Sequence, residues 1–220
     1  MTIIDNFPLI EFIYSCLIIF PSLLIYIKTK KIYNFKKHTG VRYFSNAFLF
    51  FAISFSIRFI YFISRSYSEY SLSKIMLYNN YILIFFELFF LVPGFYFFMS
   101  LTYKNFGRYR KLAWRFGIVF LFLVSLVDYF TYTFLLMYIV SIGFFSMNSF
   151  ISYRNYQKKQ TKYGQIYSTA MVLLLISWIL NFSTQYILDK IPFLRYYVYF
   201  VNVLAVLIML FIVNKMLDNF

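Results

Sequence analysis

One apolar stretch, Tyr43–Ile63, limits what this chain can fold into, because it carries Arg58 among almost wholly apolar residues. A helix of about 20 apolar residues matches the ~30 Å hydrocarbon core of a bilayer. An unpaired charge at that depth costs several kcal/mol, so Arg58 needs a partner within the protein. Ser54, Arg58 and Tyr61 are spaced i, i+4, i+7 and share one helix face. The stretch therefore predicts a spanning helix that turns a polar seam toward its neighbours.

Composition places the whole chain in the same class. Its 220 residues are 62% hydrophobic and 13% charged, with a mean hydropathy of +0.72, whereas a soluble domain is about 45–50% apolar and about 25% charged. Only 7 acidic residues, one cysteine (Cys16) and one histidine (His38) are present. This scarcity excludes an internal disulfide and an imidazole metal cluster. We therefore expect no enzyme, with no catalytic residues, metal or cofactor.

Seven apolar segments predict an all-α polytopic membrane protein that forms one transmembrane domain over residues 1–220. They run from about Ile10 to Ile27, Tyr43 to Ile63, Tyr78 to Leu101, Leu112 to Asp128, Tyr132 to Ile151, Ile166 to Leu188 and Phe193 to Met216. One continuous helix through the fourth and fifth segments is the alternative, but about 40 residues exceed a single span. The chain starts with Asp5 and Glu11 instead of a basic signal-peptide region, so the first segment is expected to remain as a permanent span.

Basic residues predict the orientation. Of the 21 lysines and arginines, 16 follow the first, third, fifth and seventh segments, and only Arg65, Lys74, Lys190 and Arg195 lie on the opposite side. Cytoplasmic loops carry the excess of basic residues, which predicts an outside N-terminus and an inside C-terminus in the cell membrane. Anionic lipid is then the expected partner of the basic loops, and nucleic acid is not expected.

The chain also aligns weakly with itself at a shift of 123 positions. The shift places Ser45, Ala47, Ile53, Ser54, Arg58 and Phe59 on Ser168, Ala170, Ile176, Ser177, Asn181 and Phe182. Half-repeats over 9–101 and 132–216, joined by the fourth segment, would form a parallel 3+1+3 arrangement. Apolar helices also match by chance, and this alternative stays open.

Polar residues within the spans define the predicted site. The candidate ligand-binding residues are Arg58, Glu87, Tyr61, Asn181, Gln185 and Asn202, in the outward half of the bundle. In one interpretation they are structural: Arg58 pairs with Glu87 or Glu11, and the amides join helices. In the other they line an outward-opening pocket, with Arg58 binding an anion and Glu87 acting as counter-ion or proton carrier. Pro21 and Pro93–Gly94 are candidate hinges, since proline breaks a helical hydrogen bond.

The run Lys36–Phe51, which follows an apolar first segment, resembles the start of the seven-helix sensor modules of prokaryotic receptor histidine kinases. The predicted topology, the outside N-terminus and the aromatic-rich spans agree with those modules. The chain carries no kinase or other output domain. The resemblance therefore implies a ligand-sensing bundle that signals through a separate membrane or cytoplasmic protein.

The 3+1+3 arrangement is also similar to that of the SWEET and PQ-loop transporters. That resemblance implies a small solute bound between the half-repeats at mid-membrane. The proline–glutamine pair of those proteins is absent here, and only Pro21 and Pro93 lie within the spans. A membrane scaffold or assembly protein without a ligand is the remaining alternative.

Overall fold

The structure is a computed structural model that describes the backbone of residues 7–68, 75–131, 134–186 and 193–218. Side chains are described over residues 10–60, 89–131, 134–183 and 196–217. The elements in these ranges are all helices: α1 (Phe7–Lys36), α2 (Thr39–Ser68), α3 (Ile75–Thr102), η2 (Gly107–Tyr109), α4 (Arg110–Thr131), α5 (Leu135–Lys159), α6 (Lys162–Tyr186) and α7 (Phe193–Asp218).

Most of these helices suit a membrane. Six of them contain a described stretch that is long and apolar enough to cross a bilayer, and the described apolar part of α3, Phe89–Thr102, is shorter. The prediction of a polytopic, all-α membrane protein is confirmed at this level. α4 ends at Thr131 and α5 begins at Leu135, so this region forms two helices, and the predicted start of the fifth helix at Tyr132 lies outside the described residues.

The helices extend beyond the apolar segments that predict them. α1 continues from Ile27 to Lys36, and α2 begins at Thr39 instead of Tyr43. The expected basic loop between them is therefore wrong: only two residues separate the helices. The reason is that hydropathy marks the part of a helix that suits lipid, whereas lysine is a good helix former and continues the helix into the polar region.

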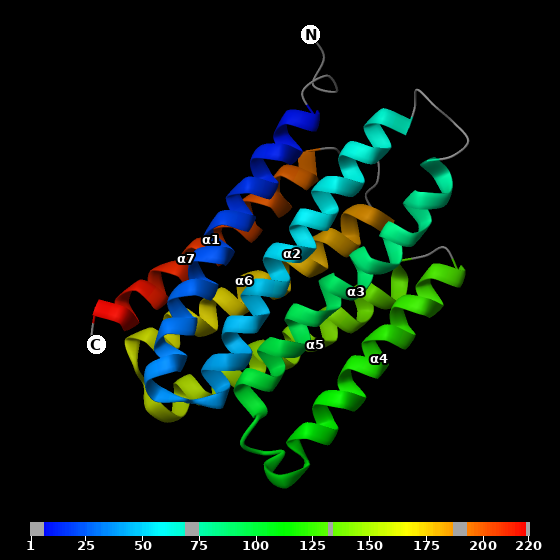
Figure 1. The fold of residues 1–220 in the computed structure, drawn as a ribbon. Helices are drawn as coiled ribbons and strands as arrows, with labels where there is room; N and C mark the ends of the chain where they lie inside the picture. The colour runs from blue at the N-terminus through cyan, green and yellow to red at the C-terminus, as the bar shows by residue number, and fades with distance from the viewer. Residues whose placement is uncertain (1–6, 69–74, 132–133, 187–192, 219–220) are drawn as a thin grey trace.

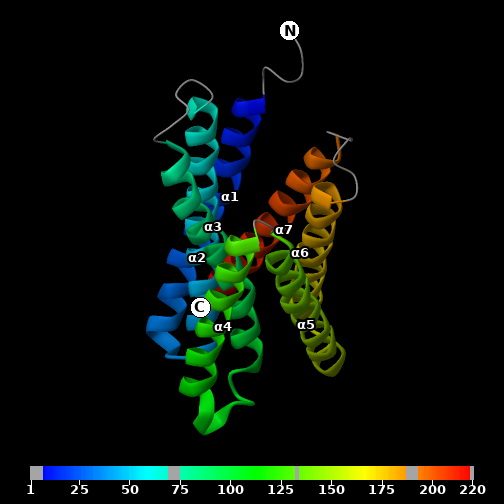
Figure 2. The same ribbon diagram turned by 90° about the vertical axis from the view of Figure 1, so that its right-hand side faces the viewer.

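Six helices form a closed ring in the order α1, α2, α3, α5, α6 and α7, with α7 packed against α1. α4 lies outside the ring against α3 and α5. α1, α2 and α3 form one side of the bundle and α5, α6 and α7 the other (Figure 2). We name the end that carries the start of α1 the N end, and the opposite end, with the turns after α1, α3 and α5, the turn end (Figure 1).

Aromatic rings fill the interior between the two sides. Phe48 of α2 meets Phe97 of α3 at 5.3 Å between ring centroids, and Phe97 meets Phe145 of α5 at 6.1 Å. Phe145 in turn stacks on Trp178 of α6 at 6.0 Å. These spacings lie in the favourable range for aromatic pairs, so one continuous aromatic core joins four helices.

Pro93 lies inside α3 and cannot donate a hydrogen bond to the carbonyl of Phe89, four residues earlier. The Ser54 hydroxyl of α2 lies against that Phe89 carbonyl, and also 2.6 Å from the Phe50 carbonyl of its own helix. Ser54 is fully buried. A carbonyl in the membrane interior has no water to bond, so a neighbouring hydroxyl is the available replacement donor.

The Gly94 carbonyl of α3, directly after Pro93, also contacts a side chain of another helix. The Asn148 amide of α5 donates to the Gly94 carbonyl at 3.2 Å. A Cβ atom at Gly94 would lie 3.3 Å from Phe144 Cβ, so glycine permits close approach of α5. Contacts from both sides of the bundle thus fix the predicted hinge Pro93–Gly94, and the other predicted hinge, Pro21, lies inside the continuous helix α1.

The α1–α2 and α5–α6 hairpins have the same turn geometry. α1 ends at Lys36 and α5 ends at Lys159, and each is followed by a residue with positive φ, 51° at Lys37 and 46° at Gln160. The N–H of each of these residues donates to a tyrosine carbonyl four positions earlier, at 2.7 Å in both turns. The helices that follow begin at Thr39 and Lys162. All these equivalent positions differ by the same 123 residues that align the sequence with itself.

Burial follows the same register along α2 and α6. When α2 and α6 are aligned at the shift of 123, seven buried side chains of α2 correspond to a buried or partly buried side chain of α6. Six of these pairs are buried in both helices: Ser45 and Ser168, Ala47 and Ala170, Phe48 and Met171, Phe51 and Leu174, Ser54 and Ser177, and Phe55 and Trp178. The two hairpins therefore turn equivalent faces toward the interior.

The contact between Ser54 and α3 leads to a double-mutant test. We expect Ser54→Ala to reduce the free energy of unfolding by about 1–3 kcal/mol, because the buried Phe89 carbonyl loses its donor. In a Pro93→Ala background, the backbone N–H gained at position 93 bonds that carbonyl, and Ser54→Ala should cost much less. Thermal unfolding in detergent measures both differences.

Ser56→Ala is the matched control, since the Ser56 hydroxyl donates only to the Ala52 carbonyl of its own helix. An equal cost of Ser54→Ala in both backgrounds would show that Ser54 bonds Phe50 and not the carbonyl freed by Pro93.

Candidate functional site

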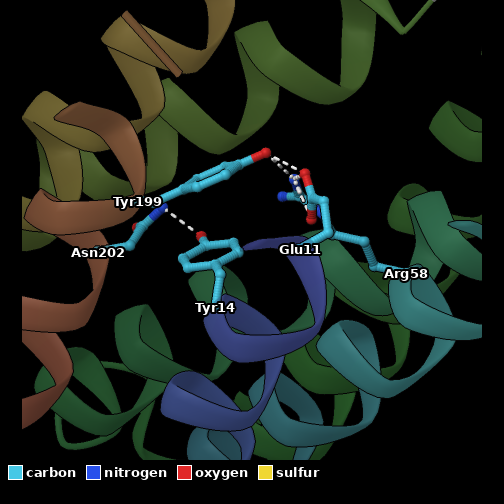
Figure 3. Close-up of polar contacts among 5 residues, drawn as sticks. All are labelled: Glu11, Tyr14, Arg58, Tyr199 and Asn202. Atoms are coloured by element: carbon cyan, nitrogen blue, oxygen red, sulfur yellow. Dashed lines mark hydrogen bonds and ion pairs between the residues drawn. The ribbon is translucent and has the colours of Figure 1, made fainter. Parts of the chain in front are cut away.

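A partly buried ion pair lies near the N end of the bundle, between α1 and α2, with the Arg58 side chain 23% and the Glu11 side chain 5% exposed. Arg58 Nη2 lies 3.0 Å from Glu11 Oε1 and 3.3 Å from Glu11 Oε2. The Tyr199 hydroxyl of α7 lies 3.2 Å from the same Nη2 and donates a hydrogen bond to Glu11 (Figure 3). Glu11 is 4% exposed. A charge buried this deeply is stable only when paired and hydrogen-bonded, and three helices supply those partners.

Aromatic rings surround the guanidinium. Arg58 Cζ lies 5.3 Å from the Tyr14 ring centroid, 5.5 Å from that of Tyr199 and 5.9 Å from that of Phe55. The rings of Tyr14 and Tyr199 stack on each other at 4.0 Å. Cation–π attraction strengthens when the cation is removed from water, so these rings stabilise the charge and hold its orientation.

A second polar layer lies one turn deeper and joins α7 to α1 and α6. The Asn202 amide donates to the Tyr14 hydroxyl at 2.9 Å (Figure 3), and the Ser177 hydroxyl donates to Asn202 Oδ1 at 2.6 Å. Asn181 Nδ2 donates to the Ser177 carbonyl at 3.1 Å. The two layers together form the polar network, which consists of Glu11, Tyr14, Arg58, Ser177, Asn181, Tyr199 and Asn202.

A small cavity of about 40 Å³ lies within the ring beside this network. It is lined by Phe51, Phe55, Arg58, Phe90, Met137, Tyr138, Trp178, Asn181 and Asn202. A site for one water needs about 10–15 Å³ of such volume, so the cavity has room for only a few atoms as it stands. A larger ligand would require the helices to separate.

Aromatic side chains form the floor of the cavity on the side of the turn end. Phe55 packs on Phe90 at 5.3 Å, and Phe90 packs edge-on against Trp178 at 5.9 Å. These three residues come from α2, α3 and α6 and are all buried. The cavity is therefore polar around Arg58 and apolar at the rings nearer the turn end.

The structure brings three of the six predicted ligand-binding residues together: Arg58, Asn181 and Asn202 all line the cavity. Tyr61, Glu87 and Gln185 lie in helices, but their side chains are outside the described residues. Glu11, one of the two acidic partners considered for Arg58, contacts it.

The sequence interpretation did not identify Tyr14 or Trp178 as part of the site. Tyr14 lies three residues after Glu11 and Trp178 three residues before Asn181, so helical spacing places each beside a polar residue already noted. This signal was available but weak, because 23 tyrosines and 32 phenylalanines give most polar residues an aromatic neighbour.

Another buried acid, Asp128, has a structural role away from the cavity. Its carboxylate accepts hydrogen bonds from the backbone N–H groups of Leu136 at 3.1 Å and Met137 at 2.6 Å. These groups lie in the first turn of α5, where N–H donors lack partners within the helix. Asp128 of α4 thus caps α5 and joins the two helices.

Comparison with known proteins gives no relative to guide the interpretation of this site. The chain matches no family model, no curated protein and no solved structure. What the site can do must therefore follow from its own chemistry.

The ion pair leads to a second double-mutant test. We expect Glu11→Gln and Arg58→Met each to reduce the free energy of unfolding by about 3 kcal/mol, because each leaves a buried polar partner uncompensated. The double variant should lose much less than the sum of the two, since neither charge remains. Thermal unfolding in detergent measures these differences, with exposed Lys31→Met as a control expected to change stability by less than about 0.5 kcal/mol. Additive losses would contradict a direct pair.

Proposed function

We propose that the chain is a non-catalytic, seven-helix membrane sensor that binds a small polar ligand in the cavity and signals through a separate protein partner. The observation that carries this proposal is the lining of the cavity: Arg58, Asn181 and Asn202 supply its polar groups, and Phe55, Phe90 and Trp178 form an apolar surface nearer the turn end. A site that is polar toward one face and apolar toward the other suits detection better than passage.

The proposal includes seven spans with the N-terminus outside and the C-terminus inside. Sixteen of the 21 basic residues support this orientation. They belong to the turns at the turn end of the bundle and to the helix ends beside those turns. The N end, with the polar network, then faces the exterior. A ligand would reach Arg58 without crossing the aromatic floor.

Arg58 is the proposed anchor for an anionic or hydrogen-bond-accepting group of the ligand. Among the described residues, its hydrogen bonds are made through Nη2 alone, to Glu11 and Tyr199. The donors on Nε and Nη1 remain for a ligand.

The network also offers a route for the signal. Glu11 and Tyr199 connect α1 and α7 to Arg58 of α2, so an anionic ligand at the remaining Arg58 donors places a second negative charge near Glu11 and weakens the junction of three helices. Binding shifts a conformational equilibrium only if the ligand favours one state, and this repulsion of Glu11 provides that difference. The partner protein would respond to the resulting change in α1 and α7.

A small-solute transporter is the second candidate, and the equivalence of the two hairpins favours it. Phe55 and Arg58 of α2 line the cavity together with Trp178 and Asn181 of α6, which are their equivalents at the shift of 123. We infer that the hairpins derive from an internal duplication. A binding site between duplicated halves is typical of transporters, in which the halves move against each other.

Cysteine accessibility distinguishes these functions without knowledge of the ligand. In a Cys16→Ser background, which removes the single cysteine, Asn181→Cys places a thiol in the cavity wall. The sensor proposal predicts modification by a membrane-impermeant maleimide from the outer face only. Mass spectrometry after labelling of sealed, oriented vesicles measures this.

Ala47→Cys is the matched control, since Ala47 is fully buried and lies below the aromatic floor in α2. It should stay unmodified from both faces. Modification of Asn181→Cys from both faces would favour the transporter, and protection from both faces would favour a scaffold without a ligand.

Orientation has its own test. We expect an epitope tag at the N-terminus to be accessible to antibody on intact cells, and a tag at the C-terminus to be accessible only after permeabilisation. The reason is that segments rich in lysine and arginine lie on the cytoplasmic side of the membrane. Immunofluorescence with and without detergent measures this. Both tags in the same compartment would contradict an odd number of spans.

A further inference from the structure

A second, larger hollow lies on the outside of the ring, between α6 and α7 at the turn end. This groove has a volume of about 500 Å³. Its polar wall is formed by Lys162, Gln165 and Thr169 of α6, and its apolar wall includes Leu207 and Phe211 of α7. The groove is separate from the cavity around Arg58, and the two share no lining residue.

The polar wall is placed where a lipid headgroup would lie. Lys162 is the first residue of both α6 and its membrane-compatible stretch, Lys162–Ser183, so its ammonium group lies at the boundary of the apolar region. Gln165 and Thr169 follow at i+3 and i+7 on the same helix face. All three are exposed, and within the described residues no hydrogen-bond partner is found for the Lys162 ammonium.

The apolar wall continues from this boundary into the membrane-compatible stretch of α7, Tyr196–Leu217. Leu207 is 44% exposed and Phe211 is 50% exposed, and both face the groove. The groove thus combines a cation and neutral hydrogen-bonding groups at one end with an apolar surface along its length. A phospholipid has the same division between phosphate and acyl chain.

In the first hairpin, the equivalent position at the start of α2 is filled by side chains of the protein. Thr39 is the equivalent of Lys162, and Arg110 at the start of α4 donates to its hydroxyl at 3.4 Å. Tyr43 is the equivalent of Ile166, and its ring packs against Tyr96 of α3 at 6.0 Å. The smaller Ile166 lines the groove between α6 and α7, which remains open. One hairpin supplies a cation and a ring at this place, whereas the other leaves space beside a lysine.

We propose that the groove between α6 and α7 is a binding site for an anionic phospholipid. Lys162 pairs with the phosphate, the Gln165 side-chain amide donates to the headgroup, and one acyl chain lies along Leu207 and Phe211. The Thr169 hydroxyl, which donates to the Gln165 carbonyl at 3.1 Å, accepts a hydrogen bond from a headgroup hydroxyl. The surrounding charge favours an anionic lipid over a zwitterionic one, because Lys158 and Lys159 lie at the end of the preceding helix. This inference depends on membrane insertion and is independent of what the central cavity binds.

Native mass spectrometry of the detergent-purified protein tests the site with two probes, phosphatidylglycerol and phosphatidylcholine. We expect phosphatidylglycerol adducts to survive at higher occupancy than phosphatidylcholine adducts. Lys162→Gln should weaken phosphatidylglycerol binding about fivefold, the factor that corresponds to about 1 kcal/mol for one basic residue near anionic lipid. Lys104→Gln is the matched control, since it removes the same charge from an exposed side chain at the turn end, in the turn after α3, without lining the groove.

A fluorescence experiment locates the acyl chain. In a Trp114→Phe, Trp178→Phe background, Phe211→Trp supplies a single reporter, and phosphatidylglycerol with brominated chains should quench it more than brominated phosphatidylcholine does. Equal quenching by both lipids, or equal loss of phosphatidylglycerol binding in Lys162→Gln and Lys104→Gln, would overturn the proposal. Displacement of the adduct by inorganic phosphate would do so as well, since it would show recognition of the phosphate alone.

Discussion

The ion pair between Glu11 and Arg58 determines how the N end of this bundle is assembled. Neither charge is stable in an apolar interior by itself, and each has its opposite charge on the other helix. α1 must therefore lie beside α2 at this depth, and the Tyr199 hydroxyl brings α7 to the same point. The ring closes here because Tyr199 of α7, the last helix, contacts Arg58 of α2 and Glu11 of α1.

The same requirement operates at backbone groups in the middle of the bundle. Pro93 leaves the Phe89 carbonyl without its helical donor, and Ser54 lies against that carbonyl from α2. Asn148 approaches the Gly94 carbonyl from α5, on the opposite side of the ring. In a medium without water the Phe89 carbonyl needs a donor from a neighbouring helix, and the Asn148 contact at Gly94 adds a second link, so this part of α3 contacts both sides of the bundle.

The apolar segments predicted the helices well, because about 20 consecutive apolar residues have few alternatives to a spanning helix. They did not predict helix ends, because hydropathy marks only the part of a helix that suits lipid. α1 therefore continues beyond its apolar segment, through lysines, to Lys36. The partner of Arg58 was left open between Glu11 and Glu87, because the choice depends on which helices adjoin. Tyr199 contacts Glu11 across 188 positions of sequence, and no local pattern encodes such a pair.

The two hairpins share their turns and their buried faces but differ in the residues that carry chemistry. Arg58 and Asn181 occupy equivalent positions and line the same cavity, yet only the arginine needs a counter-ion. Glu11 and Tyr199, which meet that need, come from α1 and α7 alone. Equivalent positions of α2 and α6 thus line the cavity but differ in charge. That difference favours the proposed sensor over the transporter, because a single charged anchor attached to α1 and α7 converts binding into a change between those helices. Two equivalent anchors would instead suit a solute passed between halves that exchange roles.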